Sequence, residues 1–262
     1  MLNIELNKFK KNHKKKLNQV LYISSNSNGI KEIENLLNNF LEEKNSFVFE
    51  SVEKGKIKGR YTIFGKRPDK VWEFNNNKGY LLKDNKRHLL KGEPKEIIEN
   101  IIENFKFKLP KELPNICALI SGYFSYDIIR YIEKIPNKCV DDLKIPDTRI
   151  LRPRLLIIHD NLKRKLFYIY NCFKEEKITN YQKKYFEIIN ELKNNIFLSN
   201  HQSNNQTNKT DKKISIKSNT TKKIFINNVK KAKKYIKLGD IFQVVLSQRF
   251  EASLNKTPLE IY

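Results

Sequence analysis

The sequence predicts an α+β fold in which antiparallel sheets carry packed helices, followed by a second domain that we expect to be truncated. Runs of aromatic and β-branched residues, such as 61–64, alternate with short turn-forming segments, a pattern that favours hairpins and meanders. Longer segments with apolar residues at helical spacing, such as 181–196, lie among them. A polar stretch at 199–221 separates these elements from a shorter second group.

The first strands are predicted in the region that begins at residue 47. The runs 47–49 and 61–64 are rich in aromatic and β-branched side chains, which suit a pleated and half-buried surface. Two further runs, 71–74 and 80–82, flank the Asn-rich spacer 75–79, which is typical of a hairpin turn. Together these runs indicate an antiparallel meander.

A helix is predicted next. Pro94 suits its first turn, and isoleucines recur at helical spacing from Ile97 onwards. A strand is predicted at 116–124 and a short helix at 127–133. Beyond these, two apolar runs separated by the turn segment 160–163 predict a second hairpin, and a long helix is expected from about residue 179.

Residues 199–221 are mostly Asn, Ser, Thr, Lys and Gln. Such a segment buries too little apolar surface to offset the entropy of ordering it, so we interpret it as a linker or a long surface loop. We therefore expect a basic N-terminal tail, a first domain, this linker and the start of a second domain, at 1–19, 20–198, 199–221 and 222–262.

The second domain is predicted to open with an amphipathic helix that Gly239 ends as a C-cap. A strand is expected at 241–250, and Thr257 and Pro258 suit the N-cap and first residue of another helix. The chain ends at Tyr262, and a single turn is not a stable helix. Truncation within a domain is the simplest interpretation, and a genuine short C-terminus is the alternative.

The net charge of +23 suggests an anionic partner such as nucleic acid, a membrane surface or a small acidic molecule. The lysines are spread along the chain, and the one dense run, Lys8 to Lys16, lies at a terminus, where basic arms are usually solvated. The sequence contains no zinc-finger spacing, no aromatic RNA-binding motif and no basic-region heptad. We therefore expect no nucleic-acid partner.

The cysteines and the hydropathy pattern indicate a cytoplasmic protein. Cys117, Cys139 and Cys172 are far apart and odd in number, which argues against a disulfide framework or a zinc site. No apolar run is long enough to cross a membrane, and the lysine-rich start lacks the apolar core of a signal peptide. The histidines are isolated, so we expect no metal ligands in this chain.

One string is specific enough to suggest a family. Residues 239–250, Gly-Asp-Ile-Phe-Gln-Val-Val-Leu-Ser-Gln-Arg-Phe, resemble the entry strand of the chorismate-binding domain in the anthranilate synthase component I family, and the helix before them resembles that family as well. Three weaker segments agree in the same order, at 47–65, 122–136 and 146–153. The resemblance covers roughly residues 20–262 and implies that family's α+β architecture, with an N-terminal regulatory domain.

The resemblance implies an L-tryptophan site in the first domain. The family's Glu-Ser pair, part of its allosteric pocket, corresponds to Glu50 and Ser51, and Arg60 is a further implied contact. A carboxylate can accept charge-assisted hydrogen bonds from the ligand's ammonium group, and a hydroxyl can both donate and accept. Without the resemblance, Glu50 would be interpreted as an ordinary carboxylate at the end of a strand.

Gln243 is the implied nucleophile-selecting position of the catalytic domain. Isochorismate-forming relatives carry a lysine there that activates water, whereas a neutral amide is a poor general base and would not generate hydroxide. Gln243 therefore fits an enzyme whose nucleophile is ammonia. Aminodeoxychorismate synthase, the sister enzyme, stays open, and so does a purely structural buried amide.

The implied reaction converts chorismate and ammonia to anthranilate and pyruvate, the first step of tryptophan biosynthesis. The family uses Mg²⁺, takes its ammonia from a glutamine amidotransferase subunit and is inhibited by L-tryptophan. Its remaining catalytic residues and its Mg²⁺ ligands have no counterpart in residues 1–262, so we expect an inactive N-terminal fragment of a lyase. The alternatives are aminodeoxychorismate synthase component I, a stand-alone tryptophan-binding module and, from charge alone, a nucleic-acid-binding protein.

Overall fold

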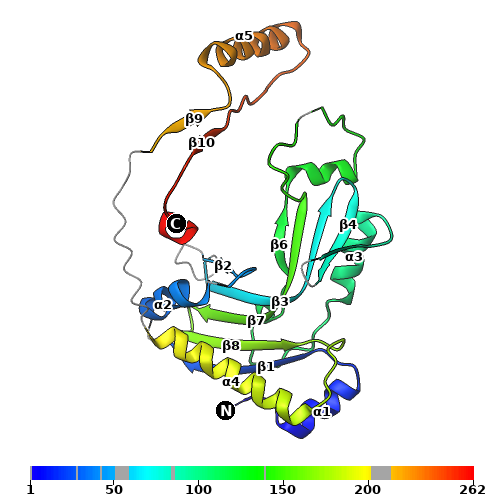
Figure 1. Ribbon diagram of the computed structural model, residues 1–262, viewed down its shortest axis with the longest axis vertical. Coiled ribbons are helices and arrows are strands. Elements are labelled where there is room, and N and C mark those ends of the chain that lie inside the picture. The colour runs from blue at the N-terminus through cyan, green and yellow to red at the C-terminus, as the bar shows by residue number, and fades with distance from the viewer. Residues whose placement is uncertain are drawn as a thin grey trace. The chain divides into compact units, whose positions relative to one another are not determined.

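In the computed structural model the chain divides into two compact units, Met1–Asn204 and Asn205–Tyr262 (Figure 1). The first unit holds a large antiparallel sheet and its helices, and the second holds a long helix and a two-stranded sheet. The structure describes residues 2–27, 29–41, 43–50, 59–83, 86–138, 140–201 and 214–262.

The sheet of the first unit confirms the predicted fold class, with antiparallel pairing throughout. Its order in the described residues is β1-β8-β7-β3-β4-β5, with β2 added to β3 and β6 added to β7. The strands are β1 (Gln19–Asn26), β2 (Phe47–Phe49), β3 (Tyr61–Asn75), β4 (Lys78–Lys83), β5 (Lys86–Leu89), β6 (Ser121–Phe124), β7 (Thr148–Asp160) and β8 (Lys165–Cys172).

Two of the predicted strands are halves of one long strand. The runs 61–64 and 71–74 both belong to β3, whose pairing with β7 shifts register between Pro68 and Lys70. Proline has no N–H to donate to the ladder, so a bulge at this point lets the strand continue. The predicted hairpin turn at 75–79 is confirmed, because β3 pairs with β4 around a tight turn.

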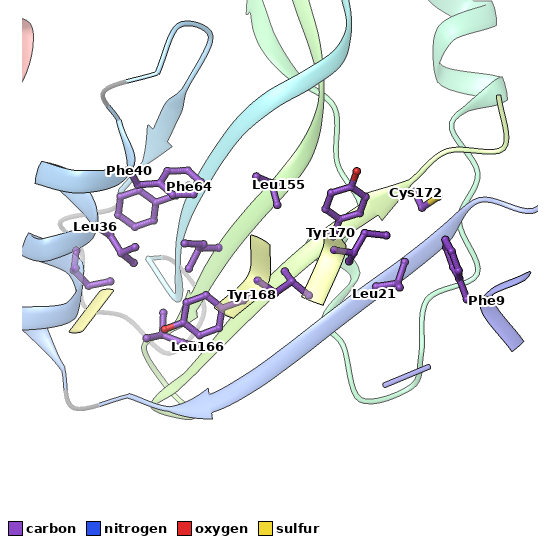
Figure 2. Packing of buried hydrophobic residues seen from close by; sticks show 14 residues of the cluster. Phe9, Leu21, Leu36, Phe40, Phe64, Leu155, Leu166, Tyr168, Tyr170 and Cys172 are labelled. Carbon is purple, nitrogen blue, oxygen red and sulfur yellow. The ribbon is translucent and has the colours of Figure 1, made fainter. Parts of the chain in front are cut away.

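Three helices cover one face of this sheet: α1 (Leu6–Lys14), α2 (Ile30–Phe40) and α4 (Tyr181–Asn200). Successive residues of a strand point to opposite faces, so Leu155 and Ile157 of β7 join this core, whereas Leu156 and Ile158 face the other way. Figure 2 shows Phe40 of α2 beside Phe64 of β3, and the two rings meet edge-on with centroids 5.9 Å apart.

The opposite face has two smaller clusters. Strand residues of β1, β7 and β8 pack there against the segment 107–119, which includes the buried Leu113 and Cys117. At the other end of the sheet, α3 (Pro94–Asn104) packs Ile97 against Trp72 and Phe74. The segment 107–119 is the one that borders the pocket described below.

The N-terminal residues are folded, in contrast to the basic tail predicted for 1–19. Helix α1 buries Phe9 completely, and the Phe9 ring meets that of Tyr181 edge-on with centroids 6.3 Å apart. The Tyr185 hydroxyl also donates to the backbone oxygen of Ile4. The lysines occupy the exposed side of an amphipathic helix. Because they are so numerous, the sequence pattern did not indicate that Phe9 is buried and holds the segment in place.

Two other elements differ from the sequence prediction. The strand expected at 116–124 is confined to β6, because a 3₁₀ turn, η1 (Asn115–Cys117), follows Pro114. The short helix expected at 127–133 is a 3₁₀ helix, η2 (Tyr126–Tyr131). In such short 3₁₀ helices the backbone hydrogen bonds form within the segment itself, and the segments are too short to show a clear periodicity of apolar residues in the sequence.

The second unit contains β9 (Ile216–Ser218), α5 (Lys222–Leu238), β10 (Phe250–Ala252) and α6 (Pro258–Ile261). Gly239 ends α5 with a left-handed φ of 79°, as its C-cap role predicts, and Thr257 and Glu260 form a capping box at α6. The predicted strand 241–250 is wrong over most of its length, since the chain is irregular from 241 to 249. A strand needs a hydrogen-bonded neighbour, and among the described residues β9 has β10 as its partner.

The predicted linker lies partly outside the described residues, at 202–213. Its described remainder includes β9 and Thr221, whose side chain caps α5 by accepting from the amide of Ile224. Within the described part of the chain, no helix combines the length and the apolarity that crossing a membrane requires.

Candidate functional site

Glu50 and Arg60 lie at the same end of the β2–β3 pair. Phe47 pairs with Gly65 and Phe49 with Ile63. Because the two strands are antiparallel, Glu50, which follows β2, and Arg60, which precedes β3, lie at the same end of the strand pair. Glu50 is exposed there. Ser51, the third predicted contact, lies outside the described residues.

Arg60 is held by a buried carboxylate at the end of β7. Its Nε and Nη2 donate to the two oxygens of Asp160 at 3.0 and 2.7 Å. The Asp160 side chain is 1% exposed and the Arg60 side chain 26%. The β7–β8 turn completes this arrangement, because the amides of Leu162 and Lys163 both donate to Oδ1 of Asp160 at 3.1 Å.

The electrostatics of this pair follow from its burial and its hydrogen bonds. Burial alone would raise the pKa of the Asp160 carboxyl, but the donors from Arg60 and from the turn amides outweigh it, so the pKa lies below its ordinary value of 3.8. The same hydrogen bond raises the pKa of Arg60. Both groups are charged near neutral pH, and the pair is a fixed, fully ionised bridge.

A pocket of about 560 Å³ opens beside this bridge. Residues 60–61 form one side, residues 111–116 form another, and Lys163 and Phe167 of the β7–β8 hairpin complete the wall with Asp160. The Arg60 guanidinium carbon lies 4.8 Å from the centre of the Tyr61 ring. Glu50 does not line this pocket.

The sequence of residues 45–262 matches the model of the chorismate binding enzyme family. The chain belongs to the chorismate binding enzyme family. It is 34% identical over 235 residues to anthranilate synthase component 1 of Acetivibrio thermocellus, a match that covers 87% of this chain and 47% of the relative.

The chain is also similar to anthranilate synthase subunits from other organisms. Anthranilate synthase component 1 of Aquifex aeolicus is 28% identical and is matched over 85% of this chain and 46% of its own. The chloroplastic anthranilate synthase alpha subunit 1 of Arabidopsis thaliana is 31% identical, over 84% and 40%. The chain thus spans about half the length of the curated relatives it matches.

The fold of this chain resembles that of a protein of known structure. The crystal structure of anthranilate synthase component I from Streptococcus pneumoniae aligns with a TM-score of 0.62 and 23% identity, over 90% of this chain and 51% of that one. This likeness shows that the two proteins share the α+β fold.

Gln243 lies in the irregular segment that follows α5, and its side chain is exposed. Its neighbours Phe242 and Val245 are 95% and 82% exposed, which is unusual for large apolar side chains. Gln243 belongs to the second unit and Arg60 to the first. In the ranges that the structure describes, no three or more His, Cys, Asp or Glu side chains form a group that could hold a metal ion.

Sequence reasoning missed Asp160 and the lysines of the pocket. Asp160 was assigned only to a turn, and its bond to Arg60 spans 100 residues of sequence. That contact depends on the register of β3 against β7, which pairs Tyr61 with Asp160. An acidic residue at a strand end opposite a basic one is a signal that becomes visible only when the register is known.

Proposed function

We propose that this chain is the part of an anthranilate synthase component I that carries the tryptophan-inhibited regulatory domain and the start of the catalytic domain. The observation that carries the proposal is the 34% identity to anthranilate synthase component 1 of Acetivibrio thermocellus over 87% of the chain. The chain divides near residue 204 into a larger first unit and a smaller second one. This division supports the proposal of a regulatory domain at 20–198 and a catalytic segment at 222–262.

The proposed reaction of the whole protein converts chorismate and ammonia to anthranilate and pyruvate. A glutamine amidotransferase subunit would deliver the ammonia in the cytoplasm. Gln243 supports ammonia as the nucleophile, since a neutral amide does not deprotonate water to a competing hydroxide. Mg²⁺ is the proposed metal, and we propose that its ligands lie in the part of the relatives' length that this chain does not span.

L-Tryptophan is proposed to bind at the β2–β3 end through Glu50, Ser51 and Arg60. An exposed carboxylate that follows β2 suits the ligand's ammonium group. Arg60, already held by Asp160, is presented in one fixed orientation. Inhibition requires that the ligand bind one of two domain arrangements more tightly than the other.

Calorimetry with L-tryptophan on the 262-residue chain tests the tryptophan site. We expect saturable binding that weakens about tenfold or more in Glu50→Gln and in Ser51→Ala, because each removes a hydrogen-bonding partner of the ligand. Glu99→Gln, on the exposed side of α3, is the matched control and should bind as the unmodified chain does. Equal affinity in Glu50→Gln and Glu99→Gln would contradict the assignment.

A further inference from the structure

We infer that the pocket beside the Arg60–Asp160 bridge is a binding site for a small anion, with a carboxylate or phosphate group placed against the Arg60 edge. The inference does not rest on the proposed function, although Arg60 takes part in both. It follows from a formed cavity, a guanidinium with one unused edge, and two lysines that line the same space.

Backbone hydrogen bonds hold the segments that form the pocket. The amide of Asn161 donates to the backbone oxygen of Arg60 at 2.8 Å, which fastens the β7–β8 turn to the entry of β3. On the other side, the amide of Leu113 donates to the oxygen of Pro110, so the segment 111–116 begins with a closed turn. A site with both walls fixed loses little entropy when a ligand binds.

Arg60 is oriented toward an anion before any ligand arrives. Asp160 occupies Nε and Nη2, and the guanidinium lies over the Tyr61 ring, which leaves Nη1 without a hydrogen bond to any described residue. A planar guanidinium fixed on one side can present its remaining donors without further ordering. Asp160 is thus a positioning residue for Arg60.

The charge balance favours an anion. Lys111 and Lys163 are exposed, line the pocket and make no ion pair with the described residues. The acidic side chains of the lining are Glu112 and Asp160, and Asp160 is already saturated by Arg60 and two turn amides. The two lysines therefore outnumber the one available carboxylate.

The cavity also has room and an apolar floor for the body of a small organic anion. Its volume of about 560 Å³ falls in the range of small-molecule pockets. Leu113 and Phe167, each 5% exposed, belong to the buried core beneath it. A carboxylate on a ring could rest the ring against this floor, whereas inorganic phosphate would use the charged rim alone.

Nuclear magnetic resonance titration of the ¹⁵N-labelled 262-residue chain tests the inference. The probes are sodium phosphate and sodium benzoate, with sodium chloride at equal ionic strength as the reference. We expect saturable shifts of the amides of Tyr61, Leu113 and Lys163 with at least one probe. The double variant Lys111→Ala/Lys163→Ala should bind that probe about tenfold more weakly, since two charged donors are lost.

The control is Lys86→Ala/Lys95→Ala, which removes the same net charge at exposed positions of β5 and α3 and should leave the affinity unchanged. Equal weakening in the two double variants, or shifts that stay linear with both probes, would overturn the inference. The variant Glu50→Gln distinguishes a failure of the anion-site inference from a failure of the tryptophan proposal. It should retain anion binding, because Glu50 does not line the pocket, and loss of anion binding there would contradict the inference.

Discussion

Asp160 is the residue on which the geometry of the first unit's candidate site depends. It accepts two hydrogen bonds from Arg60 and two from the turn that joins β7 to β8. A buried carboxylate is tolerated when its oxygens are satisfied in this way. The bridge therefore both fixes Arg60 and fastens the hairpin, and neither role was evident from the sequence.

Replacing Asp160 with Asn should destabilise the fold by about 1–3 kcal/mol near neutral pH, because a charge-assisted pair becomes a neutral and partly mismatched one. The pKa of Asp160 is lowered in the folded state, so its stabilisation is present above the ordinary value of 3.8 and is lost as pH falls through the folded-state pKa. Urea unfolding at several pH values measures this difference.

The comparison variant for Asp160→Asn is Asp127→Asn, which removes one partner of an exposed pair with Arg130. Its cost should stay below about 1 kcal/mol, as is usual for surface pairs. A difference between Asp160→Asn and the unmodified chain that stayed the same while the pH fell from neutral through the folded-state pKa would mean that the carboxylate is not the source of the stability.

At the scale of single elements, local sequence signals predicted well where the structure is decided locally. The spacer 75–79 contains Asn76 and Asn77, which adopt φ of 49° and 57°, as a tight hairpin turn requires. The start of α3 at Pro94 and the end of α5 at Gly239 also follow from local backbone chemistry. These positions needed no knowledge of distant contacts.

Elements that depend on partners were predicted less well. The apolar run 241–250 has the composition of a strand, yet only its last residue is in β10, because composition does not supply a pairing neighbour. Helix α1 was taken for a solvated arm, since its lysines outnumber its apolar residues. Burial of Phe9 decides its state, and that burial requires β1 and α4.

Phe9→Ala should therefore destabilise the first unit by about 3–5 kcal/mol, the cost expected for truncating a fully buried aromatic side chain. Lys8→Ala, on the exposed side of the same helix, should change the free energy of unfolding by less than about 0.5 kcal/mol. Chemical unfolding followed by circular dichroism measures both. Equal and small effects would restore the interpretation of residues 1–19 as a loose tail.

At the scale of the whole molecule, the second unit carries large apolar side chains that are exposed, among them Phe242, Val245 and Phe250. The chain matches about half the length of its anthranilate synthase relatives. Both observations are consistent with the proposal that residues 222–262 belong to a catalytic domain. The family could be predicted from the string 239–250, whereas the assignment of Gln243 to the active site stays a prediction.

We expect the 262-residue chain alone to form no anthranilate from chorismate, ammonium and Mg²⁺. The reason is that the proposed general acid/base and Mg²⁺ ligands lie outside it, and Gln243 by itself is no acid or base. Anthranilate fluorescence against a sample without protein is the measurement. Fluorescence above that background would show that the chain holds a catalytic apparatus that its similarity to the family does not reveal.

The most direct test of the proposed identity is to read the coding DNA beyond codon 262. We predict that the reading frame continues into the rest of a chorismate-binding domain, with the histidine and the Mg²⁺-binding glutamates of an anthranilate synthase component I. A stop codon immediately after Tyr262 would contradict the enzyme assignment for this chain, and tryptophan binding by the first unit would then be the function to examine.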